Sequence, residues 1–271
     1  MKKFSKKTPI ILIKLGGSFI TNKESSMSLK RSVIKNIVEQ IIKIQQELPD
    51  KKLIIGHGQG SFAHVPAKKY QTIDGFINDE SRLGMAIVQD RAAQLNRSIV
   101  EEFLKKKVPA VTFSASNTLI TKNREAQNDF FVLLESYLEQ GLFPVTFGDV
   151  IVDESMGCTI WSTESILGFF TKKFTEKNYI VEKIIHLTEV SGFLDQDQEV
   201  LPEITNKNWP ELKKMLTKTR GADVTGGMKL KIEESLQLAD KYGVSSYIIP
   251  GKDDNLFKLL VEKQNVGTKI S

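Results

Sequence analysis

Three glycine-rich turns in the sequence combine flexible backbone with cationic side chains. GHGQGSFAH, residues 56–64, holds three glycines and two of the chain's three histidines. KLGGS at 14–18 and GADVTGGMKLKI at 221–232 place glycines beside lysines, and Lys23 follows the first turn. A turn between a strand and a helix gathers backbone N–H groups that bind anions. Phosphoryl transfer needs alignment and positive charge, so the pattern predicts a polyphosphate site.

The common phosphate-binding fingerprints are absent from these turns. The chain lacks G-x-x-x-x-G-K-[ST], and GHGQGS does not fit G-x-G-x-x-G. Two turns from neighbouring strands are instead expected to enclose the phosphates. The third turn is expected at a helix N-terminus, with Gly226 and Gly227 followed by Lys229 and Lys231 in the first turn. Cations are unfavourable at that end of a helix unless an anion is present, which favours a bound phosphate.

The three histidines are expected to play different roles. An imidazole near two phosphates would have its charged form favoured, so His64 could donate to the phosphate of an acceptor. The alternative is a surface histidine at the start of a helix that Ser61 would cap. His57 ends a buried apolar run and is expected to be structural. His186 lies within EKIIHLT and is expected in the core or the sheet.

Composition excludes several classes of protein. Of the 271 residues, 40% are hydrophobic and 26% charged, with a net charge of +5. The lysines are dispersed without an aromatic-basic signature, so a solvated basic surface or a preference for small anions is expected, and no nucleic acid. Apolar runs are too short for a bilayer, and no apolar segment of a signal peptide follows MKKFSKK. A single cysteine, Cys158, excludes an internal disulfide and fits the cytoplasm.

Short apolar runs alternate with amphipathic helical patterns along the chain. We expect strands at 8–15, 53–57, 109–115, 142–153, 158–161, 180–188 and 245–251. We expect helices at 28–48, 81–106, 130–141, 164–174, 208–218, 226–243 and 255–263. The alternation predicts a three-layer α/β/α sandwich with a mostly parallel central sheet. Ligands of such sheets bind at the carboxyl ends of the strands, where the glycine turns fall.

Five segments in order resemble the amino acid kinase superfamily and, within it, the isopentenyl phosphate kinases. They are IKLGGSFITNKE, HGQGSFAHVPAKKY, FGDVIVD, TEVSGFLD and DVTGGMKLKI, and the likeness runs from near residue 10 to the C-terminus. The histidine of GSFAH distinguishes the isopentenyl phosphate kinases from most relatives. The resemblance implies transfer of the ATP γ-phosphoryl group to isopentenyl phosphate, with Mg²⁺, in a homodimer. It also implies one domain over 1–271, with an acceptor lobe at about 1–155 and a nucleotide lobe at about 156–271.

The resemblance also assigns roles by position. Catalytic roles are implied for Lys14, Lys23 and His64. Contacts with ATP are implied for Lys14, Gly16, Gly17, Ser18, Gly60, Glu164, Gly227 and Lys231. Contacts with the acceptor are implied for Gln59, His64 and Gly148. We expect Mg²⁺ without a dedicated protein metal site, because the histidines and the cysteine show no zinc spacing and Mg²⁺ commonly binds through phosphates. Asp149, Glu164 and Glu189 are candidates for water-mediated contacts, and a structural role is favoured for each.

The chain departs from the family pattern chiefly on the nucleotide side. Ala63 replaces a glycine, STES places Glu164 where an aspartate is expected, and TEVSG carries Glu189 and Ser191 in place of aspartates. The loop between FGDV and STES is short. These changes leave nucleotide preference and turnover open. The alternatives are a kinase of the same fold for another phosphate or phosphonate such as fosfomycin, a less favoured UMP kinase, and a non-catalytic effector-binding module.

Overall fold

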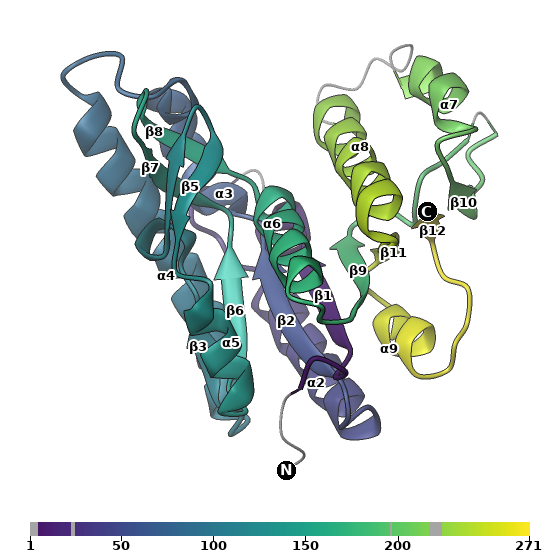
Figure 1. The fold of residues 1–271 in the computed structure, drawn as a ribbon. Coiled ribbons are helices and arrows are strands. Elements are labelled where there is room, and N and C mark those ends of the chain that lie inside the picture. Colours follow the sequence, from purple (N-terminus) through teal and green to yellow (C-terminus); the bar gives the residue numbers. More distant parts are fainter. Residues whose placement is uncertain (1–4, 23–24, 196, 217–223) are drawn as a thin grey trace.

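A computed structural model describes residues 5–22, 25–195, 197–216 and 224–271. Its centre is an eight-stranded sheet with the order β10-β12-β11-β9-β1-β2-β6-β3 (Figure 1). The strands are β1 (Ile10–Leu15), β2 (Lys52–His57), β3 (Ala110–Thr112), β6 (Phe143–Phe147), β9 (Val181–Thr188), β10 (Glu203–Ile204), β11 (Ser245–Pro250) and β12 (Thr268–Ile270). Neighbouring strands are parallel except β11 with β12. The predicted mostly parallel sheet is confirmed.

Helices cover both faces of the sheet because its central strands are apolar on both sides. These helices are α2 (Arg31–Glu47), α4 (Ser81–Lys105), α5 (Val132–Glu139), α6 (Thr163–Glu176), α8 (Val224–Tyr242) and α9 (Asn255–Leu260). Every residue of β1 is buried, and alternate residues face opposite sides. Ile11 and Ile13 pack in a core with α2, α4 and α9. Ile10 and Leu12 pack in a second core with α5 and α6, which completes the predicted three-layer α/β/α sandwich.

A second sheet lies beside the carboxyl ends of the central strands, with the order β5-β4-β7-β8. Its strands are β4 (Leu119–Lys122), β5 (Glu125–Asp129), β7 (Asp149–Asp153) and β8 (Gly157–Trp161). The hairpin of β7 and β8 was predicted, whereas β4 and β5 were missed because their sequence is mostly polar. Asp153 at the end of β7 holds β4 and the turn that follows it in place. Its carboxylate accepts hydrogen bonds from the Thr121 hydroxyl at 2.9 Å and the Arg124 amide at 2.8 Å.

Several predicted boundaries were wrong. The strand expected at 109–115 ends at Thr112, and a short 3-10 turn, η2 (Ala115–Asn117), follows it. The helix expected from residue 28 begins at Arg31, because Leu29 forms a β-bridge with Thr21. Ser61 caps no helix, because α3 (Gly60–Lys69) begins before it and the Ser61 amide donates to the Thr21 hydroxyl at 3.0 Å.

The remaining helices are short. They are α1 (Gly17–Ile20), the 3-10 turn η1 (Thr72–Asp74) and α7 (Trp209–Leu216), which matches the helix expected at 208–218 as far as the described residues reach. Within the described ranges, no helix is both long and apolar enough to span a bilayer. In Figure 1 the arrowheads of β6 and β9 point to the top of the view, where α3 and the second sheet lie on one side and α8 on the other.

Candidate active site

The first two glycine turns touch at the carboxyl ends of neighbouring strands. The last residues of β1 and β2, Leu15 and His57, are register partners. A methyl group on Gly17 would lie 2.6 Å from the backbone nitrogen of Gly60, and one on Gly58 would lie 2.8 Å from that of Gly17. Side-chain carbons do not approach so closely, so the turns require glycine in order to approach each other. The expected pairing of two glycine turns is confirmed.

The backbone amides of these turns divide into two groups. The N–H of Gly16 donates to a carbonyl of β9 at 2.8 Å, and that of Gly58 donates to a carbonyl of β1 at 2.9 Å. These two amides extend the sheet and are not available to a phosphate. Gly17 and Ser18 are the first two residues of α1, whose N–H groups fall outside the helical hydrogen-bond ladder. Of the amides predicted to line a polyphosphate here, those of Gly17 and Ser18 suit it best.

Lys14, Glu164 and Lys231, from β1, α6 and α8, form a buried to partly buried group that we term the charged cluster. Lys14 is 8% exposed and forms an ion pair with Glu164. Burial opposes the ionisation of Glu164, but the charges of Lys14 and Lys231 outweigh it and lower the pKa of the carboxyl to about 2. Burial, reinforced by the charge of Lys14, lowers the pKa of Lys231 to about 8. Three residues predicted to contact ATP therefore lie together, with two ammonium groups and one carboxylate.

The third glycine turn is placed differently from the prediction. Because α8 begins at Val224, Gly226 and Gly227 lie inside its first turn and Lys231 follows in the second. A methyl group on Gly227 would meet no described atom outside its own helix within 4 Å, so packing does not require glycine there. Lys23 and residues 217–223 lie outside the described residues, and their predicted roles rest on sequence alone.

Lys30 joins the first glycine turn to the loop after β9, and the sequence had not indicated it. Its ammonium donates to the carbonyl of Ser18 at 2.8 Å and forms an ion pair with Glu189. Glu189 is one of the positions where the chain departs from the family pattern, and Lys30 engages its carboxylate. No local pattern could reveal this link, because the two residues are 159 positions apart in the sequence.

Hydrogen bonds tie the second glycine turn to the FGDV turn that follows β6. The Gln59 side chain donates to the Gly148 carbonyl at 2.9 Å, and the Gly148 amide donates to the His57 carbonyl at 3.1 Å. The Thr163 hydroxyl at the start of α6 donates to the same His57 carbonyl at 2.6 Å. The Gln59 side chain and the Gly148 amide are thus structural. The expected contact of Gln59 with an acceptor remains a prediction for its backbone, and that of Gly148 remains a prediction in which its amide takes no part.

His57 and His64 lie in contrasting environments. His64 is in α3 and exposed. The buried His57 ring accepts a hydrogen bond at Nε2 from the Asn96 amide (3.1 Å) and donates from Nδ1 to the Gly58 carbonyl (3.0 Å). It also stacks on Phe147 with centroids 5.5 Å apart. Burial lowers the pKa of His57 to about 4, so the ring is neutral at physiological pH. The predicted structural role of His57 is confirmed.

Asp149 of FGDV fixes the segment after β3. Its carboxylate accepts hydrogen bonds from the Ser114 hydroxyl at 2.9 Å and the Ser116 amide at 3.0 Å. Burial raises its pKa despite these bonds. The carboxylate is therefore used to shape η2, which also explains why the predicted strand stops at Thr112. His186 lies in β9 and is 3% exposed, as expected for a residue of the sheet.

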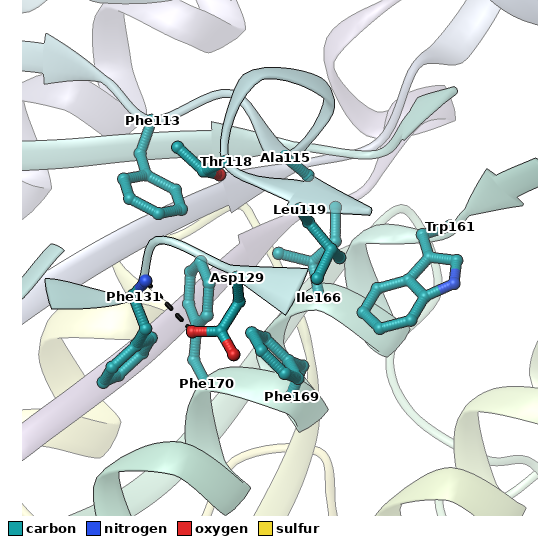
Figure 2. Close-up of a pocket in the computed structure, with 10 residues that line it drawn as sticks. All are labelled: Phe113, Ala115, Thr118, Leu119, Asp129, Phe131, Trp161, Ile166, Phe169 and Phe170. Carbon is teal, nitrogen blue, oxygen red and sulfur yellow. Dashed lines mark hydrogen bonds between the residues drawn. The ribbon is translucent and has the colours of Figure 1, made fainter. Parts of the chain in front are cut away.

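Two cavities lie away from the glycine turns. Figure 2 shows a pocket lined by aromatic side chains of α6, of β8 and of the segments that follow β3 and precede α5, with a volume of about 10 Å³, room for one water. Its one charged lining residue is Asp129. The Asp129 carboxylate accepts a hydrogen bond from the Phe131 amide at 3.1 Å and forms an ion pair with Lys173 at 2.8 Å. A larger cavity of about 790 Å³ lies where β2 and β6 begin, at the opposite end of the sheet. Neither cavity is lined by a predicted site residue.

Comparisons with known proteins agree over nearly the whole chain. The amino acid kinase family model matches residues 9–250. An isopentenyl phosphate kinase of Methanothermobacter thermautotrophicus is 30% identical over 276 residues, which cover 97% of this chain and 99% of that protein. An isopentenyl phosphate kinase of Methanocaldococcus jannaschii is 28% identical over 270 residues, which cover 96% of this chain and 98% of that protein. A solved structure of an isopentenyl phosphate kinase superposes with a TM-score of 0.80 at 28% identity. The superposition covers 97% of this chain and 100% of that one.

Proposed function

The chain belongs to the amino acid kinase family, and we propose that within it this protein is an isopentenyl phosphate kinase. In the reaction, a phosphate oxygen of isopentenyl phosphate attacks the γ-phosphorus of ATP. The bond from that phosphorus to the bridging oxygen breaks, which leaves ADP and isopentenyl diphosphate. The observation that carries the proposal is the full-length likeness to proteins of this name, 30% identical over 97% of the chain.

The charged cluster is suited to hold the phosphates of ATP. Phosphoryl transfer asks the protein for positioning and for positive charge along the transfer path. Lys14 near the end of β1 and Lys231 of α8 supply two ammonium groups, and the Glu164 carboxylate pairs with the first and attracts the second. Gly17 and Ser18 add backbone donors beside them. Lys23 would stabilise the transferring phosphoryl group, a role proposed from its sequence position.

The acceptor is proposed to bind on the other side of the two touching turns. His64 would donate to the phosphate of isopentenyl phosphate, with contacts from Gln59 and Gly148. The hydrogen bond from Gln59 to Gly148 keeps these positions together. In this proposal residues 1–155 form the acceptor lobe and residues 156–271 the nucleotide lobe. The acceptor tail would be contacted by side chains of 65–117.

Mg²⁺ is proposed to enter with ATP and to neutralise charge on its phosphates. In the described part of the chain, no three His, Cys, Asp or Glu side chains are grouped to hold a metal ion. The three carboxylates considered for water-mediated contacts are engaged: Glu164 by Lys14, Glu189 by Lys30 and Asp149 by η2. We therefore propose that phosphate oxygens of ATP are the chief ligands of the ion.

Two further properties are proposed, an oligomeric state and a location. A homodimer follows from the family resemblance. A cytoplasmic location fits the single cysteine, Cys158, which is buried with its thiol pKa raised to about 11 by burial and by Asp153, and so is unreactive.

A panel of acceptors tests the proposed function. ADP release would be measured with isopentenyl phosphate, fosfomycin, UMP and no acceptor, each with Mg²⁺ and ATP. The proposal expects the highest kcat/KM for isopentenyl phosphate. Faster turnover with fosfomycin or UMP would favour another acceptor on the same fold. ATP binding without ADP release for every acceptor would favour the effector-binding module.

A further inference from the structure

His186 lies beside the charged cluster, on the same face of the sheet. Its register partners are Lys14 in β1 and Ile248 in β11. Register partners in neighbouring strands point their side chains to the same face. Lys14 reaches Glu164 of α6 on this face, and Ile248 packs in a core that includes residues of α8. The His186 imidazole therefore lies between the strands and the two helices that carry the rest of the cluster.

The imidazole of His186 is buried without hydrogen bonds. It is 3% exposed, and neither ring nitrogen has a partner among the described residues. Both ring nitrogens of the equally buried His57 are bonded. A buried polar group without a partner lowers stability, and an apolar side chain would avoid that loss. Ile184, two residues earlier on the same face, and the register partner Ile248 are buried apolar residues, so the histidine needs a reason other than packing.

The charges around His186 determine which kind of partner it can take. Burial lowers its pKa to about 3, Lys231 and Lys14 act in the same direction, and Glu164 opposes them. The ring is therefore neutral at physiological pH and offers one N–H donor and one lone pair. Of the two lysines, Lys231 acts on it more strongly, and Lys14 already pairs with Glu164. The lone pair is thus a neutral acceptor near the partly buried Lys231 ammonium.

We infer that His186 is a positioning residue for Lys231, whose ammonium donates to a ring nitrogen of the imidazole while it binds the phosphates of ATP. In the structure the Glu164 carboxylate attracts both ammonium groups. Bound phosphates compete with the carboxylate for the same ammonium groups. An ammonium has three N–H donors, so those that phosphate does not use still need an acceptor in this site. The neutral ring provides one without adding a third positive charge. This inference rests on the proposed function, because it requires ATP.

The test compares His186→Leu and His186→Gln with a matched control, Ser246→Ala. Ser246 is fully buried in β11, and its hydroxyl also has no partner among the described residues. The melting temperature without nucleotide and the Kd of MgATP by calorimetry would be measured for each. His186→Leu should raise the melting temperature by about 2–4 °C and weaken MgATP binding about tenfold. Ser246→Ala should raise the melting temperature without changing the Kd. His186→Gln, which keeps an acceptor, should regain most of the MgATP affinity.

One result overturns the inference directly. If His186→Leu behaved like Ser246→Ala, with a higher melting temperature and a Kd for MgATP within twofold of wild type, His186 would be only a residue of the sheet. If His186→Leu did not fold, the ring ¹⁵N signals of His186 in the wild-type protein would decide. Added MgATP should shift one of them, and unchanged signals would refute the inference. These readouts report ATP binding, so they stay valid even if isopentenyl phosphate is not the acceptor.

Discussion

Replacing Glu164 by glutamine should destabilise the protein and increase the stabilisation that MgATP provides. The carboxylate is 12% exposed, and its pKa is about 2 instead of the ordinary 4.5. At about 1.4 kcal/mol per pKa unit, this difference corresponds to about 3 kcal/mol. Removing one partner of a buried ion pair costs a similar amount, about 3–5 kcal/mol. For a chain of this size, about 3 kcal/mol lowers the melting temperature by roughly 6–12 °C.

The assay is thermal unfolding of wild type and Glu164→Gln with and without saturating MgATP. The phosphates would bring negative charge to two ammonium groups that glutamine leaves unpaired, so the nucleotide should raise the melting temperature of the variant more than that of wild type. Glu189→Gln is the control, because its side chain is 46% exposed and its one ion pair among the described residues is with Lys30. An exposed pair contributes about 0–1 kcal/mol, so this variant should melt within a few degrees of wild type.

The pH dependence gives a second check on Glu164. Because its pKa in the folded protein is below the ordinary value, its contribution is complete above pH 4.5 and is lost as the pH falls towards 2. The difference in stability between wild type and Glu164→Gln should therefore shrink on acidification. Equal melting temperatures for Glu164→Gln and Glu189→Gln at neutral pH would refute the reasoning about the charged cluster.

Three further predictions concern Lys231, the glycine turns and the histidines. The pKa of Lys231 is about 8, so kcat/KM for ATP should fall as the pH rises through 8, and Lys231→Arg should move that fall to higher pH; a flat profile would contradict this. Gly58→Ala places a methyl group 2.8 Å from the backbone nitrogen of Gly17. Calorimetry should show both a lower melting temperature and weaker MgATP binding. Unchanged values of both would show that the turns need not touch. In steady-state kinetics His64→Ala should lower kcat/KM for the acceptor about 10- to 150-fold, whereas His57→Ala should chiefly lower the melting temperature; the reverse pattern would show that the wrong histidine was chosen.

The layers of the fold could be predicted because they follow from periodic patterns. Apolar runs such as IILIKL are buried on both faces, which is typical of a parallel sheet between helices. The polar strands β4 and β5 carry no such pattern. They exist because the Asp153 carboxylate binds backbone and side-chain donors from residues 121 to 124, and that contact depends on the tertiary structure.

The candidate site was partly predictable for the same reason. Glycine turns and their lysines are local features, and the sequence placed Lys14 and Lys231 on the nucleotide side before the structure showed them together. The link made by Lys30 and the position of His186 beside the charged cluster both depend on elements far apart in the chain, and no spacing in the sequence indicates them. The contact between the two turns was expected. The hydrogen bond that the Gly16 amide donates to a carbonyl of β9 was not.

Phosphorus NMR of the reaction products tests the central claim most directly. The purified protein would be incubated with Mg²⁺, ATP and isopentenyl phosphate, and the ³¹P signals followed over time. The account predicts that the monophosphate signal disappears while two coupled signals of an organic diphosphate grow, with one ADP formed for each acceptor consumed. An unchanged monophosphate signal from folded protein that binds ATP would contradict it.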